Sequence, residues 1–74
     1  TNYLRSPMPG LLVSIAVRVG DSVKAGDEVA IVEAMKMENS LRVEQDAVVV
    51  AVHASPGETL DVDQPIIEFE PDAA

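Results

Sequence analysis

Residues 13–33 read VSIAVRVGDSVKAGDEVAIVE and residues 50–70 read VAVHASPGETLDVDQPIIEFE, two stretches that share one pattern of apolar, turn and acidic positions. The match extends without a gap, so that residues 4–33 fall on residues 41–70 at an offset of 37 positions. Identical residues occur at several pairs, among them Gly20 with Gly57 and Glu33 with Glu70. Because turn residues fall on turn residues and apolar residues on apolar ones, we interpret the chain as an internal duplication.

Each half is predicted to consist of short strands separated by turns. Apolar residues alternate with smaller or polar ones, which is the period-2 pattern of a half-buried strand, at Val13, Ile15, Val17 and Val19 and again at Val48, Val50, Val52 and Ala54. Turns follow at Gly20 and Gly57, because glycine tolerates positive φ, and again at 26–27 and 63–65. Closing strands are predicted over 29–33 and 66–70, and Pro7 and Pro9 are expected at an edge or bend.

Two related half-domains of about four short strands each predict an all-β fold. We expect a flattened eight-stranded barrel or sandwich with a pseudo-twofold axis, in which each half covers the apolar face of the other. The segment 34–39 would then form a tight hairpin at one end, with the chain termini at the opposite end. Residues 33–38 are nearly all good helix formers. We nevertheless predict a hairpin, because isolated helices this short are marginal and the repeat places strands on both sides.

Length and composition narrow the possible functions. The chain has 74 residues, one domain by its length, with no cysteine and with 47% hydrophobic residues. Its formal net charge of −8 disfavours binding to nucleic acid or to anionic membranes. The first residue is Thr1, so we expect a fragment of a longer multidomain chain, with a domain core over about 4–71.

Lys36 is the residue that draws attention as a functional site. It stands at the join of the two halves, where the repeat has no counterpart, and Met35 and Met37 lie on either side of it. Methionine offers flexible, polarizable surface that suits docking with several partners. A methionine pair tucked under the hairpin for structural reasons is the alternative. Lys24, the other lysine, reads as a solvated turn charge.

The stretch Glu33-Ala34-Met35-Lys36-Met37-Glu38-Asn39 resembles the biotinylation motif of biotin carboxyl carrier domains, whose centre is Ala-Met-Lys-Met. The resemblance extends to residues 6–10 and 19–23 and covers nearly the whole chain. It is strongest to the C-terminal carrier domain of acyl-CoA carboxylase subunits of the propionyl-CoA carboxylase kind. Lipoyl carrier domains share the repeat and the hairpin lysine, but there Asp and Ala typically flank the lysine.

The resemblance implies that biotin is amide-linked to Lys36, with Ala34, Met35 and Met37 as the motif flanks. It implies biotin protein ligase, biotin carboxylase and carboxyltransferase as partners, and a carrier role without a catalytic site of its own. Glu33, Glu38 and Asn39 are candidates for orienting the lysine. Such a domain works in the bacterial cytoplasm, which we prefer, or in the mitochondrial matrix. A lipoyl carrier and an unmodified interaction module are the alternative hypotheses.

The second half departs from the family pattern, which often has Ala-Pro and Gly where this chain has Val43, Glu44 and Ala47. If the bend at Ala47, the counterpart of Gly10, requires positive φ, alanine costs about 1 kcal/mol there. The gapless repeat indicates that the chain lacks the thumb insertion of some family members. His53 has no second histidine or cysteine beside it and reads as a surface residue, and 61–63 lacks the further ligands of a calcium loop.

Overall fold

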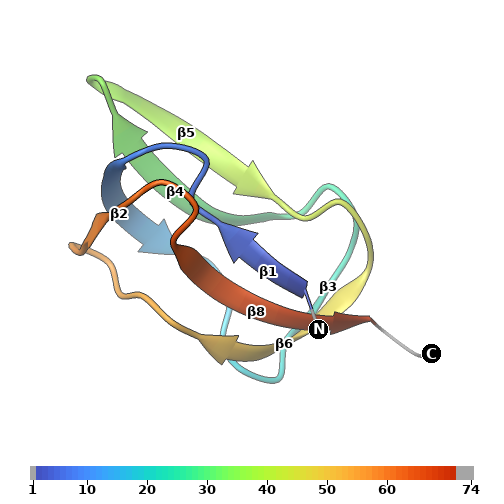
Figure 1. Ribbon diagram of the computed structural model, residues 1–74. Helices are drawn as coiled ribbons and strands as arrows, with labels where there is room; N and C mark the ends of the chain where they lie inside the picture. Colours follow the sequence, from blue (N-terminus) through green and yellow to red (C-terminus); the bar gives the residue numbers. More distant parts are fainter. Residues whose placement is uncertain (1, 72–74) are drawn as a thin grey trace.

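The computed structural model describes residues 2–71, which form eight strands (Figure 1). In chain order they are β1 (Asn2–Arg5), β2 (Gly10–Ile15), β3 (Ser22–Val23), β4 (Glu28–Ala34), β5 (Met37–Arg42), β6 (Ala47–Val52), β7 (Thr59–Leu60) and β8 (Pro65–Pro71). The described residues contain no helix, and the prediction of a hairpin at 34–39 is confirmed over the local helix propensity. No helix within residues 2–71 is therefore long and apolar enough to cross a membrane.

The strands form two antiparallel four-stranded sheets that face each other. One sheet has the order β1-β8-β6-β3 and the other the order β5-β4-β2-β7. The predicted eight-stranded fold is confirmed as a sandwich, because the two sheets are not closed into a single barrel. The β4–β5 hairpin projects at one end, and the start of β1 and the end of β8 lie at the other, as predicted (Figure 1).

The internal repeat is a real symmetry of the fold. Adding 37 to the bounds of β2, β3 and β4 gives the bounds of β6, β7 and β8. Strand registers follow the same rule, since Leu12 pairs with Val32 and Val49 pairs with Phe69. A side-chain hydrogen bond is repeated as well: Arg5 donates to the carbonyl oxygen of Asp63, and Arg42 donates to the carbonyl oxygen of Gly26. The two arginines therefore make equivalent contacts in the two halves.

The two layers do not coincide with the two halves of the sequence, which corrects the expectation that each half covers the other. Strand β1 of the first half lies beside β8 of the second, and β3 pairs with β6. By symmetry β5 pairs with β4, and β7 pairs with β2. Each sheet therefore takes two strands from each half, so neither half can complete a sheet alone.

The core between the sheets is aliphatic, as the near absence of aromatic residues predicts. Its fully buried side chains come from both halves: Leu12, Val29, Val32, Val49, Leu60, Ile66 and Ile67. Phe69 is buried among them, whereas the Tyr3 side chain is 44% exposed. Burying a side chain of this size contributes about 1.5–3 kcal/mol, so a domain of this length depends on these few residues.

The predicted alternation along the first strand is right beyond a β-bulge and wrong before it: Ile15 and Val17 pack against the core, whereas the fully buried residue before the bulge is Leu12. Register shifts occur between Leu12 and Ser14 and, symmetrically, between Val49 and Ala51, and they mark a β-bulge in each half. A bulge adds one residue and reverses which side chains face the core. Leu12 and Val49 are consequently the buried residues. Strand β2 ends at Ile15, and Val19 lies beyond it with 63% of its side chain exposed.

Gly10 and Ala47 differ for a reason other than backbone φ. Neither residue has positive φ, so Ala47 carries no left-handed strain. A Cβ built on Gly10 would lie 2.5 Å from the carbonyl oxygen of Glu33, 3.0 Å from Cγ1 of Val32 and 3.3 Å from Cβ of Ala34. Glycine is required there by the close approach of β2 to β4, and at the symmetric position Ala47 is a buried residue of the core.

Candidate functional site

The β4–β5 hairpin turns within two residues, Met35 and Lys36, between the paired Ala34 and Met37. Both turn residues have positive φ, 51° and 65°. Two-residue hairpins with positive φ at both central positions normally use Asn-Gly or similar pairs. An ordinary side chain in this region costs about 1–2 kcal/mol. Strain of this kind is typical of functional positions, and here it falls on the predicted site.

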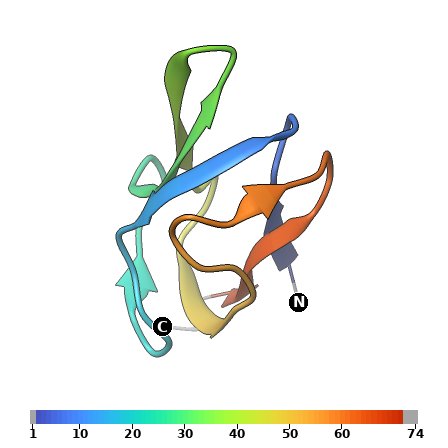
Figure 2. The same ribbon diagram turned by 90° about the vertical axis from the view of Figure 1, so that its left-hand side faces the viewer.

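The hairpin stands well clear of the rest of the molecule (Figure 2). Met35 is 94% exposed and Met37 is 68% exposed, while Ala34, the residue immediately before the turn, is buried. The predicted exposure of the methionines is therefore confirmed, and the alternative of a pair tucked under the hairpin is wrong. Lys36 is exposed between them. Lys24 forms a salt bridge with Asp46 at 3.6 Å. Within residues 2–71, Lys36 forms no salt bridge.

The stem of the hairpin has two chemically different faces. Side chains alternate along a strand, so Met37 and Asn39 of β5 share the face of the buried Val32 and Ala34 in β4. Glu33 and Glu38 lie directly opposite each other on the other face, and both are exposed. The site thus consists of one lysine at the tip, an apolar inner face and an acidic outer face.

The candidates for orienting Lys36 do not reach it directly. Within the described chain, no hydrogen bond or salt bridge joins Glu33, Glu38 or Asn39 to the Lys36 side chain. The Asn39 amide instead faces Met8, whose Sδ lies 3.8 Å from Nδ2. Met8 was not among the predicted site residues. A signal for it existed in the sequence, because Met8 and Gly10 both break the internal repeat.

The remaining candidate residues lie elsewhere with ordinary roles. His53 is exposed, and its Nε2 lies 3.0 Å from a carboxylate oxygen of Glu68. Lys24 is a solvated turn residue as predicted. The turn carboxylates of Asp21 and Asp27 each accept a hydrogen bond from a backbone N–H three residues earlier, at 2.9 Å. These acidic residues stabilise turns.

Fold and site together define a class of protein: a small two-sheet carrier domain that presents one accessible lysine on a projecting hairpin. The family model described as biotin-requiring enzyme matches residues 2–69. Over 70 residues the chain is 51% identical to the propionyl-CoA carboxylase alpha chain of Ruegeria pomeroyi, covering 95% of this chain and 10% of that one. It is 38% identical over 66 residues to the biotin carboxyl carrier protein of Streptococcus mutans, covering 89% and 51%.

A solved structure of a single-chain, multi-domain long-chain acyl-CoA carboxylase superposes with a TM-score of 0.91 at 28% identity, over 97% of this chain and 7% of that one. The chain belongs to the biotin- and lipoyl-carrying family of biotin-requiring enzymes. It is homologous to biotin carboxyl carriers, and the cofactor of this family is biotin. The chain spans about a tenth of the length of the propionyl-CoA carboxylase alpha chain that it matches.

Proposed function

We propose that biotin is joined by an amide bond to Nζ of Lys36, and that the domain carries a carboxyl group between the two active sites of an acyl-CoA carboxylase. The observation that carries the proposal is the exposed Lys36 at the tip of a strained two-residue turn, between two exposed methionines. The other lysine of the chain, Lys24, forms a salt bridge with Asp46 at 3.6 Å.

The residues at the tip fit such an attachment. Acylation removes the charge of Lys36, so the formal net charge of −8 becomes −9 (−8 minus 1). No ion pair within residues 2–71 is lost in this step. Met35 and Met37 supply apolar surface on both sides of the reacting amine. Ala34, the residue immediately before the turn, is buried and lies against Gly10.

The chain contributes attachment and presentation. When bound, biotin supplies a ureido nitrogen that accepts and releases the carboxyl group, and the partner active sites supply the catalysis. The two-sheet sandwich holds the hairpin at one end (Figure 2). A tethered group reaches both active sites at a high effective concentration. In this proposal the domain has no catalytic site of its own.

The proposed partners follow from the same geometry. A biotin protein ligase would bind the hairpin tip first, and biotin carboxylase and carboxyltransferase sites would bind it later. Each partner would meet the same small surface, and the adaptable side chains of Met35 and Met37 suit repeated docking. The names of the relatives support propionyl-CoA or another acyl-CoA as the acceptor handled by the whole enzyme.

Intact and peptide mass spectrometry tests the proposal. The 74-residue chain is incubated with a biotin protein ligase, biotin and ATP, beside the variants Lys36→Arg and Lys24→Arg. We expect one biotinyl group on Lys36 of the parent chain and of Lys24→Arg, and none on Lys36→Arg. Lack of modification of the parent chain, or modification at Lys24, would reject the proposal in favour of an interaction module.

A further inference from the structure

Met8 is anchored at both its backbone and its side chain beside the base of the hairpin. The hydroxyl of Ser6, a fully buried residue, donates to the carbonyl oxygen of Met8 at 2.6 Å. Nδ2 of Asn39 lies 3.8 Å from the Met8 sulfur, 3.4 Å from the carbonyl oxygen of Met37 and 3.5 Å from that of Val32. One amide group thus lies between the backbones of both hairpin strands and the Met8 thioether.

The chain is also held against the hairpin immediately after Met8. Gly10 approaches β4 so closely that a Cβ would lie 2.5 Å from the carbonyl oxygen of Glu33 and 3.3 Å from Cβ of Ala34. These two residues are the last before the turn at Met35 and Lys36. Segment 6–10 therefore contacts the stem of the hairpin from its inner side, and we call this segment with Asn39 the brace.

The internal symmetry provides a control for the brace within the same molecule. At the opposite end Asn2 occupies the position of Asn39, whereas Val43, Gln45 and Ala47 replace Ser6, Met8 and Gly10. The strand registers around the two sites are nevertheless the same. The two-sheet fold therefore does not by itself require serine and methionine at these positions, and glycine is needed only where β2 approaches β4 closely.

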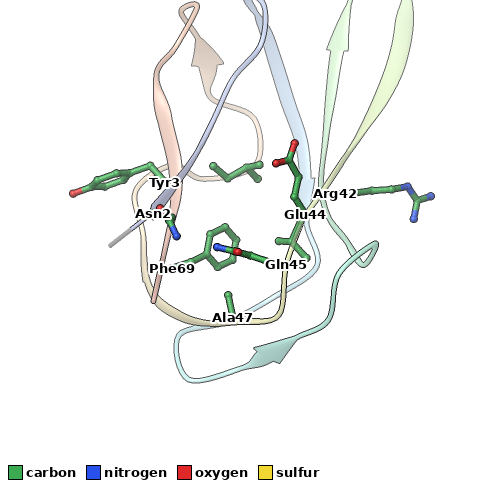
Figure 3. Close-up of a pocket in the computed structure, with 9 residues that line it drawn as sticks. Asn2, Tyr3, Arg42, Glu44, Gln45, Ala47 and Phe69 are labelled. Atoms are coloured by element: carbon green, nitrogen blue, oxygen red, sulfur yellow. The ribbon is translucent and has the colours of Figure 1, made fainter. Parts of the chain in front are cut away.

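The symmetric site contains a cavity of about 520 Å³, lined by residues that include Asn2, Gln45, Ala47 and Phe69. Figure 3 shows the Gln45 side chain running toward the Phe69 ring at this end of the sandwich. What distinguishes the braced end is the projecting hairpin that carries Lys36, so the brace belongs to the presentation of that lysine.

We propose that Met8 and Asn39 are positioning residues that fix the direction of the hairpin for attachment of biotin, an inference that rests on the function proposed above. Strand β2 supports β4 only as far as the pair of Leu11 with Glu33, so beyond it the hairpin is a two-stranded ribbon, which by itself is only marginally stable. The brace restricts bending of the stem, which holds the Lys36 amine in a narrow range of orientations. Reaction rates depend on such orientation of the reacting groups.

The test compares Asn39→Ala and Met8→Ala with their symmetric counterparts Asn2→Ala and Gln45→Ala. Ligation of biotin is followed under kcat/KM conditions, well below the melting temperature of every variant. We expect Asn39→Ala and Met8→Ala each to lower kcat/KM by roughly fivefold, the factor of one net hydrogen bond or comparable contact. The double variant should lose no more than either single variant, because the two residues act as one unit. Met8→Leu should restore most of the rate.

A second measurement separates positioning from stability. ¹⁵N relaxation order parameters for residues 34–38 should fall in Asn39→Ala and remain unchanged in Asn2→Ala. Wild-type kcat/KM in both brace variants would overturn the inference while leaving the proposed function intact. An equal loss in Asn2→Ala, or a lowered melting temperature with an unchanged rate, would overturn it too. Lack of biotin on Lys36 of the parent chain would instead reject the proposed function.

Discussion

Gly10 and Ala47 occupy symmetric positions, but only the second has room for a Cβ atom. Gly10→Ala places a Cβ 2.5 Å from the backbone oxygen of Glu33, and backbone cannot move aside easily. We expect a loss of about 1–3 kcal/mol in the free energy of unfolding, the usual cost of overpacking. Urea denaturation measures it, with the linear slope showing whether the denatured state has changed.

Ala47→Gly is the matched control for this prediction. Ala47 is buried and has ordinary negative φ, so its removal costs roughly 1 kcal/mol through lost packing and a more flexible unfolded chain. One substitution adds a methyl group and the other removes one, and both should lower the free energy of unfolding. An unchanged midpoint for Gly10→Ala would mean that β2 can move away from β4 at no cost, and the close contact would lose its importance.

The turn of the hairpin is the element in which stability and function should oppose each other. Met35 has φ of 51°, a conformation that asparagine adopts more readily than methionine. We expect Met35→Asn to raise the free energy of unfolding by about 0.5–1 kcal/mol. The same variant should slow attachment of biotin, because it removes the most exposed apolar side chain of the tip.

Thermal unfolding by circular dichroism and the ligation assay check the two effects separately. Met37→Asn is the control, since Met37 lies in β5 with no positive φ and gains nothing from asparagine. A loss of stability in Met35→Asn would show that methionine packs usefully at the tip. Faster ligation in that variant would contradict the proposed role of the Met35 side chain.

Most strands could be predicted from the sequence because the internal repeat shows each strand pattern twice, so that one copy supports the assignment of the other. The repeat placed β4, β8 and the hairpin to within about one residue, and it correctly overrode the helix propensity of 33–38. The bulges were missed because Val13 and Val50 each follow another large apolar residue, Leu12 and Val49, so either phase of alternation is plausible at the start of the strand. The contact of Asn39 with Met8 joins residues 31 positions apart and depends on packing that no local pattern reports.

The whole molecule consists of two equivalent halves, and this pseudo-twofold symmetry leads to a further prediction. Pro71 and Asn2 occupy the positions of Ala34 and Asn39, because 34 plus 37 is 71 and 2 plus 37 is 39. Joining Ala74 to Thr1 would place four residues, 72–74 and 1, between Pro71 and Asn2. Four residues, 35–38, also lie between Ala34 and Asn39.

A circular permutant that joins these ends and opens the chain between Lys36 and Met37 should therefore keep the same two-sheet fold, since it exchanges one hairpin for its symmetric equivalent. We expect a far-UV circular dichroism spectrum like that of the parent chain and a single cooperative transition, because each sheet still takes strands from both halves. Its Lys36, now at a free end, should be a poor substrate for ligase. An unfolded permutant would show that the closed β4–β5 hairpin is needed for folding itself. A folded permutant biotinylated at the parent rate would show that the ligase reads the residues around Lys36 without the geometry of the turn.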